Sequence, residues 1–396
     1  MIFARTQGRT LLKRLGILAL ATLLVASCFS LSRALAAGEP YSIGAVLSES
    51  GPGSSLGRPE ADSVQLAVDE INKAGGVSGH PLKVTIVDDE SNPTTAVNAV
   101  RSLLDQKVIA IVGPSLTQTS LAVSPIVADA GVPMISLGSS AQIIEPAADH
   151  KWIFKVPITD IHMARLIQGA LKKQNQLKVA VIYRDDDYGK TGLTHFEDAG
   201  KSVGIDVIDS EAIASTASDA TTQLTHIKAA NPQAVVVWTT LPSAATVIKS
   251  YRELSVPYPL YYSDGAATGV FLAQAGDALN GAYIASLKIN VADQLPPGDP
   301  QARLLRHYID AFDQLYPKDA PVSIFGGFGY DSIYLLKTAL QSAGTAQADK
   351  LRDALEHTTY LGASGMFRIS PSDHNGLAQD STVLTKIDGG KFTIAH

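Results

Sequence analysis

Short apolar runs alternate with stretches of helical periodicity from Tyr41 onward. This alternation predicts repeated β-α units, whose parallel strands form a sheet covered by helices on both faces. In the first unit the strand runs from Tyr41 to Leu47, and the following helix has Pro59 in its first turn and ends at Gly75-Gly76. One face of this helix is apolar and is expected to pack on the sheet; its residues are Ala61, Val64, Ala67, Val68 and Ile71.

The predicted strands form two series, and a chain of 396 residues is long enough for two cores. The remaining strands of the first series are Leu82–Val87, Val108–Val112 and Pro133–Ser136. The second series comprises Lys178–Tyr183, Asp206–Ile208, Ala234–Trp238 and Leu260–Tyr262. Farther on we expect helices near Pro300–Tyr316 and Gly329–Ser342, then a β-hairpin over Val383–Ile394. The predicted fold class is therefore α/β, with two doubly wound parallel-sheet lobes.

Composition and charge exclude several classes of protein. With 45% hydrophobic and 18% charged residues, the chain is neither disordered nor a multi-pass membrane protein. Its net charge is −6, and the body of the chain has no run rich in Lys and Arg. Because nucleic-acid binding depends on such basic clusters, we expect no nucleic-acid partner.

Residues 1–36 are predicted to form a secretory signal peptide. Four basic residues, Arg5, Arg9, Lys13 and Arg14, precede an apolar run from Leu15 to Val25, and small residues follow. The run is too short for a confident membrane span, which needs about 20 apolar residues. We therefore expect export to the periplasm.

Two cleavage sites are possible in this leader. Ala34-Leu35-Ala36 has the small-x-small pattern of ordinary signal peptidase, while Val25–Cys28 resembles a lipoprotein box. Cys28 is the only cysteine, so the mature body cannot form an internal disulfide. Cys28 is either an incidental residue of the signal's core or the site of a lipid anchor.

Signals for catalysis or metal binding are poor. Gly113-Pro114-Ser115 lacks the second glycine of a nucleophile elbow, and the glycines of Gly51–Gly57 do not fit a dinucleotide fingerprint. The nine histidines have no metal-ligand spacing, and Asp185-Asp186-Asp187 lacks the spaced oxygens of a calcium loop. We expect no enzyme activity, no metal and no cofactor.

Three segments rich in hydroxyls and glycine follow predicted strands: Ser48–Gly57, Gly113–Ser120 and Ser136–Ser140. Open α/β sheets build their binding crevices at the carboxyl ends of strands. Hydroxyls and free N–H groups at helix N-termini suit a carboxylate, because the unpaired donors and the helix dipole favour negative charge. Ordinary helix capping by Ser and Thr is the alternative for any one segment.

Taken in order, these and other segments resemble the leucine/isoleucine/valine-type periplasmic binding proteins, which have the type I solute-binding fold. The resemblance covers nearly the whole mature chain. The matching segments are SGPGSSLG (50–57), LAVDEINKAGGVSG (66–79), VDDESNP (87–93), VIAIVGPSLTQTS (108–120), GVPMISLGSS (131–140), RDDDYG (184–189) and GASGMFRISPSDHNG (362–376).

The resemblance implies a site for a ligand's α-carboxylate in the first lobe. Thr117 and Ser140 match the hydroxyls that hold this carboxylate, together with the backbone of Ser115 and Gly138. Ser139 lies in the same segment and is included in the predicted site.

The resemblance also implies contacts from the second lobe and the side-chain pocket. Asp264 matches the acid that binds the α-ammonium, Tyr188 an aromatic residue that covers the ligand, and Phe325 an aromatic residue near the side-chain pocket. Two positions depart from the family, because Leu56 and Thr240 stand where branched-chain amino acid binders have tyrosines. The ligand therefore cannot be assumed to be leucine, isoleucine or valine.

The resemblance further implies three hinge crossovers between the lobes, expected near Pro157, Leu287 and Gly362. The expected lobes are then discontinuous: residues 37–157 and 288–362 form lobe 1, and residues 158–287 and 363–396 form lobe 2. Closure of these lobes around the ligand would create the form that a membrane permease recognises.

The resemblance predicts a monomeric solute-binding component of an ABC importer that captures an amino acid or related small carboxylate. Two alternatives stay open. The chain could be a ligand-sensing module of the same fold, or a binder of an aromatic acid or amide.

Overall fold

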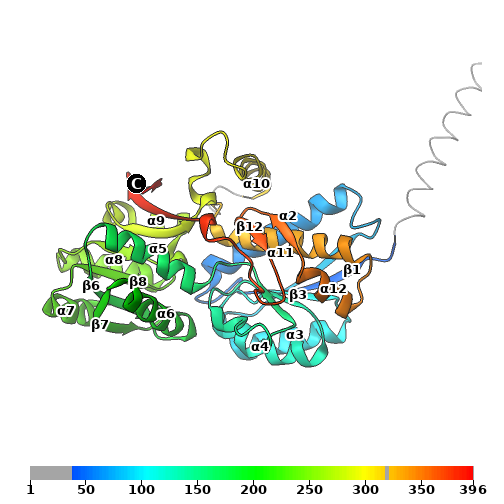
Figure 1. Cartoon of the computed structure of the whole chain (residues 1–396), viewed down its shortest axis with the longest axis horizontal. Coiled ribbons are helices and arrows are strands. Elements are labelled where there is room, and N and C mark those ends of the chain that lie inside the picture. Colours follow the sequence, from blue (N-terminus) through cyan, green and yellow to red (C-terminus); the bar gives the residue numbers. More distant parts are fainter. Residues whose placement is uncertain (1–37, 317–320, 396) are drawn as a thin grey trace, which may run out of the picture.

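The computed structural model describes residues 38–316 and 321–395, so the predicted signal peptide and Cys28 lie outside the described residues. The first lobe is built on a parallel five-stranded sheet in the order β2-β1-β3-β4-β5. Figure 1 labels β1 and β3 of this sheet. Its strands are β1 (Tyr41–Leu47), β2 (Leu82–Asp88), β3 (Ala110–Val112), β4 (Met134–Ser136) and β5 (Ile153–Lys155).

Helices cover both faces of this sheet, as the alternating side chains of β1 require. Ile43, Ala45 and Leu47 belong to one hydrophobic core, whereas Val46 belongs to a second core on the opposite face. The helix α2 (Ser54–Lys73) packs on the first face, and α3 (Pro93–Asp105) and α4 (Thr117–Ala130) pack on the second (Figure 1).

Local sequence explains where these helices begin and end. Asn92 caps α3, because its side chain accepts hydrogen bonds from the N–H groups of Thr94 and Thr95, with Pro93 in the first turn. Gly131 ends α4 in the left-handed conformation, with φ of 62°.

The second lobe is built on a seven-stranded sheet in the order β14-β13-β10-β9-β8-β6-β7. The strands from β6 to β10 are parallel, and β13 and β14 add an antiparallel edge. They are β6 (Lys178–Arg184), β7 (Asp206–Ile213), β8 (Ala234–Trp238), β9 (Leu260–Tyr262), β10 (Tyr283–Leu287), β13 (Thr382–Asp388) and β14 (Lys391–Ile394).

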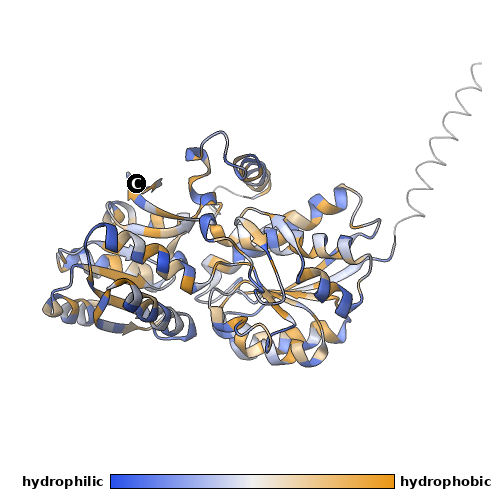
Figure 2. Ribbon diagram, in the orientation of Figure 1, coloured by the Kyte–Doolittle hydropathy of each residue, from blue (hydrophilic) through white to orange (hydrophobic). Residues whose placement is uncertain are grey.

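Five helices accompany this second sheet. They are α5 (Asp160–Lys173), α6 (Asp187–Val203), α7 (Thr221–Ala230), α8 (Ser243–Glu253) and α9 (Gly269–Ala275). Figure 2 shows hydrophobic residues along the strands of both sheets and hydrophilic residues on the outer sides of the helices. The cores of both lobes are therefore sheet-on-helix layers, as the β-α alternation predicts.

After β10 the chain returns to the first lobe. The returning elements are α10 (Ala302–Leu315), α11 (Ile324–Ala343), α12 (Ala348–Leu355), β11 (Thr359–Leu361) and β12 (Met366–Arg368). Helix α11 lies along α2, and β11 pairs with β12 in a small antiparallel sheet. The C-terminal β13–β14 hairpin then belongs to the second sheet.

The α/β fold class and the C-terminal hairpin are confirmed, with some elements longer than predicted. The helix predicted from Gly329 begins at Ile324, because the Ser323 hydroxyl caps it by accepting from Gly326 N–H. The lobe limits and crossovers stay proposals. The predicted crossovers near Pro157, Leu287 and Gly362 are among them.

Candidate functional site

Loops at the carboxyl ends of strands from both sheets meet at a small cavity of about 10 Å³ between the lobes. Seven of the ten predicted site residues line it. Its complete lining is Leu56, Ser115, Leu116, Thr117, Ser139, Arg184, Tyr188, Thr240, Gly265 and Phe325. A cavity of this size has room for about one water molecule, so a larger ligand can enter only when the lobes separate.

Three predicted residues, Gly138, Ser140 and Asp264, are not in this lining. The backbone N–H of Gly138 donates to the Ser136 hydroxyl at 3.0 Å. The Ser140 hydroxyl accepts from Gln142 N–H at 3.2 Å and so caps the short helix Ala141–Ile143. Both groups already have partners within the protein, and their predicted contact with a carboxylate stays a prediction.

In the first lobe, Thr117 is the first residue of α4 and is 2% exposed. Among the described residues its hydroxyl has no hydrogen-bond partner. The N–H groups of a helix's first turn also lack partners within the helix. The start of α4 therefore offers a cluster of donors suited to a carboxylate.

The hydroxyl of Ser115, by contrast, is already engaged behind the cavity. It donates to Glu60 Oε2 at 2.5 Å and accepts from the N–H of Ser48 at 3.0 Å. Glu60 is fully buried, and this burial raises its pKa well above the ordinary value. Only the backbone of Ser115, the group that the resemblance assigns to the ligand, remains for binding.

In the second lobe, Asp264 and Tyr188 form one buried polar cluster. The Tyr188 hydroxyl lies 2.9 Å from Ser263 Oγ and 3.2 Å from Asp264 Oδ1. Burial raises the pKa of Asp264 to about 6, against the opposing effects of the Tyr188 hydroxyl and the charge of Lys155. A buried carboxyl of this kind gains from a positively charged partner.

The two lobes contact each other at this cluster. The Ser139 hydroxyl, from the first lobe, makes a long contact of 3.5 Å with Asp264 Oδ2. Lys155, the last residue of β5, is completely buried, and its ammonium donates to the carbonyls of Ser139 and Pro157 at 2.9 and 2.6 Å. Burial lowers the pKa of Lys155 to about 8. The lysine thereby ties the Ser139 loop to the segment where the chain leaves the first lobe.

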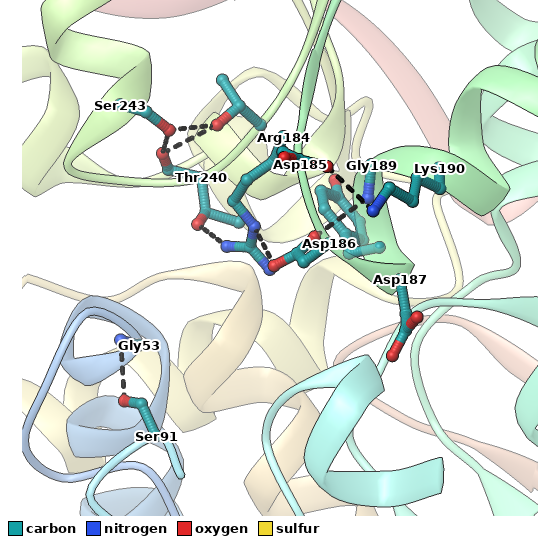
Figure 3. A network of polar contacts seen from close by, with 12 residues as sticks. Gly53, Ser91, Arg184, Asp185, Asp186, Asp187, Gly189, Lys190, Thr240 and Ser243 are labelled. Carbon is teal, nitrogen blue, oxygen red and sulfur yellow. Dashed lines mark hydrogen bonds and ion pairs between the residues drawn. The ribbon is translucent and has the colours of Figure 1, made fainter. Parts of the chain in front are cut away.

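Arg184 lines the cavity but is not among the predicted site residues. It is the last residue of β6 and only 3% exposed. Its guanidinium donates to the Thr240 hydroxyl and forms an ion pair with Asp186 at 2.5 Å (Figure 3). It also lies 5.2 Å from the Tyr188 ring centroid. Its position directly after the predicted strand Lys178–Tyr183 was the available signal. Leu116 and Gly265 are two further lining residues that the sequence did not single out.

The first predicted segment, Ser48–Gly57, forms one wall of a second and larger cavity. Gly53 N–H donates to Ser91 Oγ at 2.9 Å, which holds this loop against the loop after β2 (Figure 3). The cavity has a volume of about 540 Å³ and is lined from both lobes. Its lining includes Pro52, Ser55, Arg58 and Asp62 from the first lobe and Leu241, Pro242, Thr268 and Gln274 from the second.

Residues 40–391 match the family model described as periplasmic binding protein. The chain belongs to this family. Its members are extracytoplasmic solute-binding proteins. The predicted family is therefore confirmed by the family match, and the type I fold is confirmed by the similarity to solved structures given below.

Two relatives show which proteins this chain resembles in sequence. It is 25% identical over 382 residues to a Leu/Ile/Val-binding protein of Rhizobium johnstonii, covering 95% of this chain and 100% of the relative. It is also 25% identical over 317 residues to a leucine-, isoleucine-, valine-, threonine- and alanine-binding protein of Pseudomonas aeruginosa, covering 80% of this chain and 82% of the relative.

Solved structures agree with the fold. An extracellular ligand-binding receptor from Rhodopseudomonas palustris has a TM-score of 0.82 and 29% identity, covering 90% of this chain and 99% of that one. The branched-chain amino acid binding protein LivJ from Streptococcus pneumoniae, solved with isoleucine, has a TM-score of 0.78 and 25% identity, covering 89% and 97%.

Neither a membrane-spanning helix nor a metal-binding cluster is found in the described parts of the chain. No helix within residues 38–316 and 321–395 is long and apolar enough to cross a bilayer. Over the same residues, no group of three or more His, Cys, Asp and Glu side chains is placed to hold a metal ion.

Proposed function

We propose that this chain is the solute-binding component of an ABC importer, which captures an amino acid or related small carboxylate between its lobes and delivers it to an inner-membrane permease. The observation that carries the proposal is a pair of polar groups at the cavity, one from each lobe. Thr117, at the start of α4, supplies free donors from one lobe, and the acid Asp264 lies beside the cavity in the other.

These two groups match the two charges of an amino acid. The α-carboxylate accepts from the Thr117 hydroxyl and the first N–H groups of α4, where the helix dipole favours negative charge. The α-ammonium pairs with Asp264, and this ion pair replaces the solvation that closure removes from the ammonium. Tyr188 then covers the ligand, and Leu56 and Phe325 contact its carbon skeleton.

Closure of the lobes is the proposed mechanism of capture. The contact between Ser139 and Asp264 joins the lobes next to the cavity, and the ligand enters when this contact opens. Ligand bound by both lobes favours the closed form, which is a population shift about the hinge. The permease would recognise this closed, monomeric form in the periplasm.

A ligand panel tests this function. Thermal shift with amino acids, amides and aromatic acids should identify a stabilising ligand, and calorimetry should then measure its affinity. Stabilisation by an aromatic acid or an amide alone would favour the alternative binder. Binding without any closure of the lobes would contradict the capture mechanism. A ligand-sensing module would bind and close but would fail to stimulate transport when reconstituted with the permease.

A further inference from the structure

We propose that Arg184 determines specificity and selects an amino acid whose side chain ends in a carboxylate or carbonyl oxygen. This inference rests on the proposed function and names the ligand class for the same cavity. It starts from the position of Arg184 at the end of β6, where its side chain lines the cavity from the second lobe.

The guanidinium is incompletely satisfied by the protein. Its contacts are the hydrogen bond from Nη1 to Thr240 Oγ1 and the ion pair of Nε with Asp186, and Figure 3 shows it between these two residues. A guanidinium carries more N–H donors than these two contacts can use, and it stays charged in proteins. The remaining donors at this 3% exposed side chain need an acceptor once water is excluded.

The opposite wall of the cavity has a different character. Leu56 of α2 is 5% exposed, Phe325 of α11 is 2% exposed, and both line the cavity. They suit the methylene groups of a ligand side chain. A ligand side chain with an apolar stem and a terminal oxygen would pack against Leu56 and Phe325 and accept hydrogen bonds from Arg184. A purely aliphatic side chain would leave the N–H donors of Arg184 without an acceptor.

The same residue explains one of the two departures from the branched-chain pattern. Thr240 stands where a tyrosine is expected, and its hydroxyl accepts from Arg184. The tyrosine ring would instead bring a larger apolar surface to this side of the cavity. The pair of Arg184 and Thr240 thus makes this side of the cavity polar.

The experiment compares four probes by calorimetry on the mature protein: L-glutamine, L-glutamate, L-leucine and L-valine. We expect glutamine or glutamate to bind about tenfold or more tighter than leucine and valine. Arg184→Met should remove this preference and weaken binding of the oxygen-bearing ligand by roughly tenfold to a hundredfold. The matched control is Arg101→Met, which changes an exposed arginine of α3 and should leave all four affinities unchanged.

Folding is controlled with a second variant. Arg184→Met leaves Asp186 without its partner, so the double variant Arg184→Met/Asp186→Asn keeps the local charge balanced, and the melting temperature reports whether each variant folds. The comparison of probes on the unmodified protein tests the ligand class even if both variants fail to fold. A folded Arg184→Met variant that keeps the preference for glutamine or glutamate would overturn the role of Arg184. Leucine or valine binding at least as tightly as glutamine and glutamate would overturn the inference but leave the solute-binding function intact. Failure of all four amino acids to bind would overturn this inference too, and failure of every ligand in the thermal-shift panel as well would overturn the proposed function itself.

Discussion

Replacing Asp264 with Asn should separate stability from binding, because the two depend on this carboxyl in opposite directions. In the protein without ligand, burial raises the pKa of Asp264 from 3.8 to about 6. The folded state therefore holds the proton more tightly than the unfolded state. The contribution of protonated Asp264 to the free energy of unfolding is fully present below pH 3.8 and is lost as the pH rises to about 6.

The magnitude follows from this interval. The difference between the ordinary pKa of 3.8 and the folded-state pKa of about 6 corresponds to a loss of about 3 kcal/mol in the free energy of unfolding at neutral pH. Asn does not ionise, so the free energy of unfolding of Asp264→Asn without ligand should exceed that of the original protein at pH 7, by up to about 3 kcal/mol. The difference in the free energy of unfolding between Asp264→Asn and the original protein should shrink as the pH falls towards 4, because Asp264 is then protonated and also uncharged.

Binding should change in the opposite sense. A buried ammonium without its carboxylate is strongly disfavoured, so Asp264→Asn should weaken amino-acid binding by roughly 2–5 kcal/mol. Urea unfolding at pH 4 and pH 7 measures the first effect, and calorimetry measures the second. Asp313→Asn, at an exposed position of α10, is the control and should change neither quantity.

Two outcomes would refute this reasoning. Unchanged affinity of Asp264→Asn, together with impaired binding by Thr117→Ala, would show that the ligand carries a carboxylate without an amine. In that case Asp264 would serve only as a turn residue next to Gly265. Equal free energies of unfolding for Asp264→Asn and the original protein at both pH values would show that burial does not disfavour the ionised form of Asp264.

Three further predictions concern the carboxylate site, closure and export. Thr117→Ala deletes one hydroxyl but leaves the backbone donors of α4, so calorimetry should show a loss of about 1–3 kcal/mol in binding; a loss as large as that of Asp264→Asn would contradict this ranking. Ligand should reduce the radius of gyration in solution scattering, and at about a hundred times the dissociation constant it should stabilise the folded protein by about 2.7 kcal/mol, seen as a higher melting temperature; binding without compaction would argue against a hinge. N-terminal sequencing of the exported protein should find a start near Ala37 or a lipidated Cys28, and retention of Met1 on cytosolic protein would refute export.

Periodicity was enough to predict most of the fold. The strand Tyr41–Leu47 was predicted with its observed limits, because five of its seven residues are buried and turn signals follow it. The strand β10, with five residues, was not predicted, and neither were β5, β11 and β12, which have only three residues each. A strand of that length is too short to show a period, so its place depends on pairing with neighbours that are distant in the sequence.

The candidate site was predicted in part, and its gaps have a physical cause. Thr117 and Ser139 line the cavity as expected. The hydroxyls of Ser115 and Ser140, however, are engaged with Glu60 and the N–H of Gln142. Sequence spacing shows that hydroxyls gather at strand ends, but it cannot show which of them already have partners. That choice is made by a glutamate 55 residues away in the case of Ser115.

Two groups at the cavity are incompletely stabilised by the protein itself: the Thr117 hydroxyl and the ionised carboxyl of Asp264. Buried polar groups in folded proteins are normally hydrogen-bonded, so exceptions call for an explanation. Among the described residues, the Thr117 hydroxyl has no partner, and at the same cavity the burial of Asp264 raises its pKa. Each of these features costs stability in the protein without ligand, and an amino acid of opposite charge pattern relieves both. A local cost to folding at these two groups is what we expect of a site that binds a charged ligand.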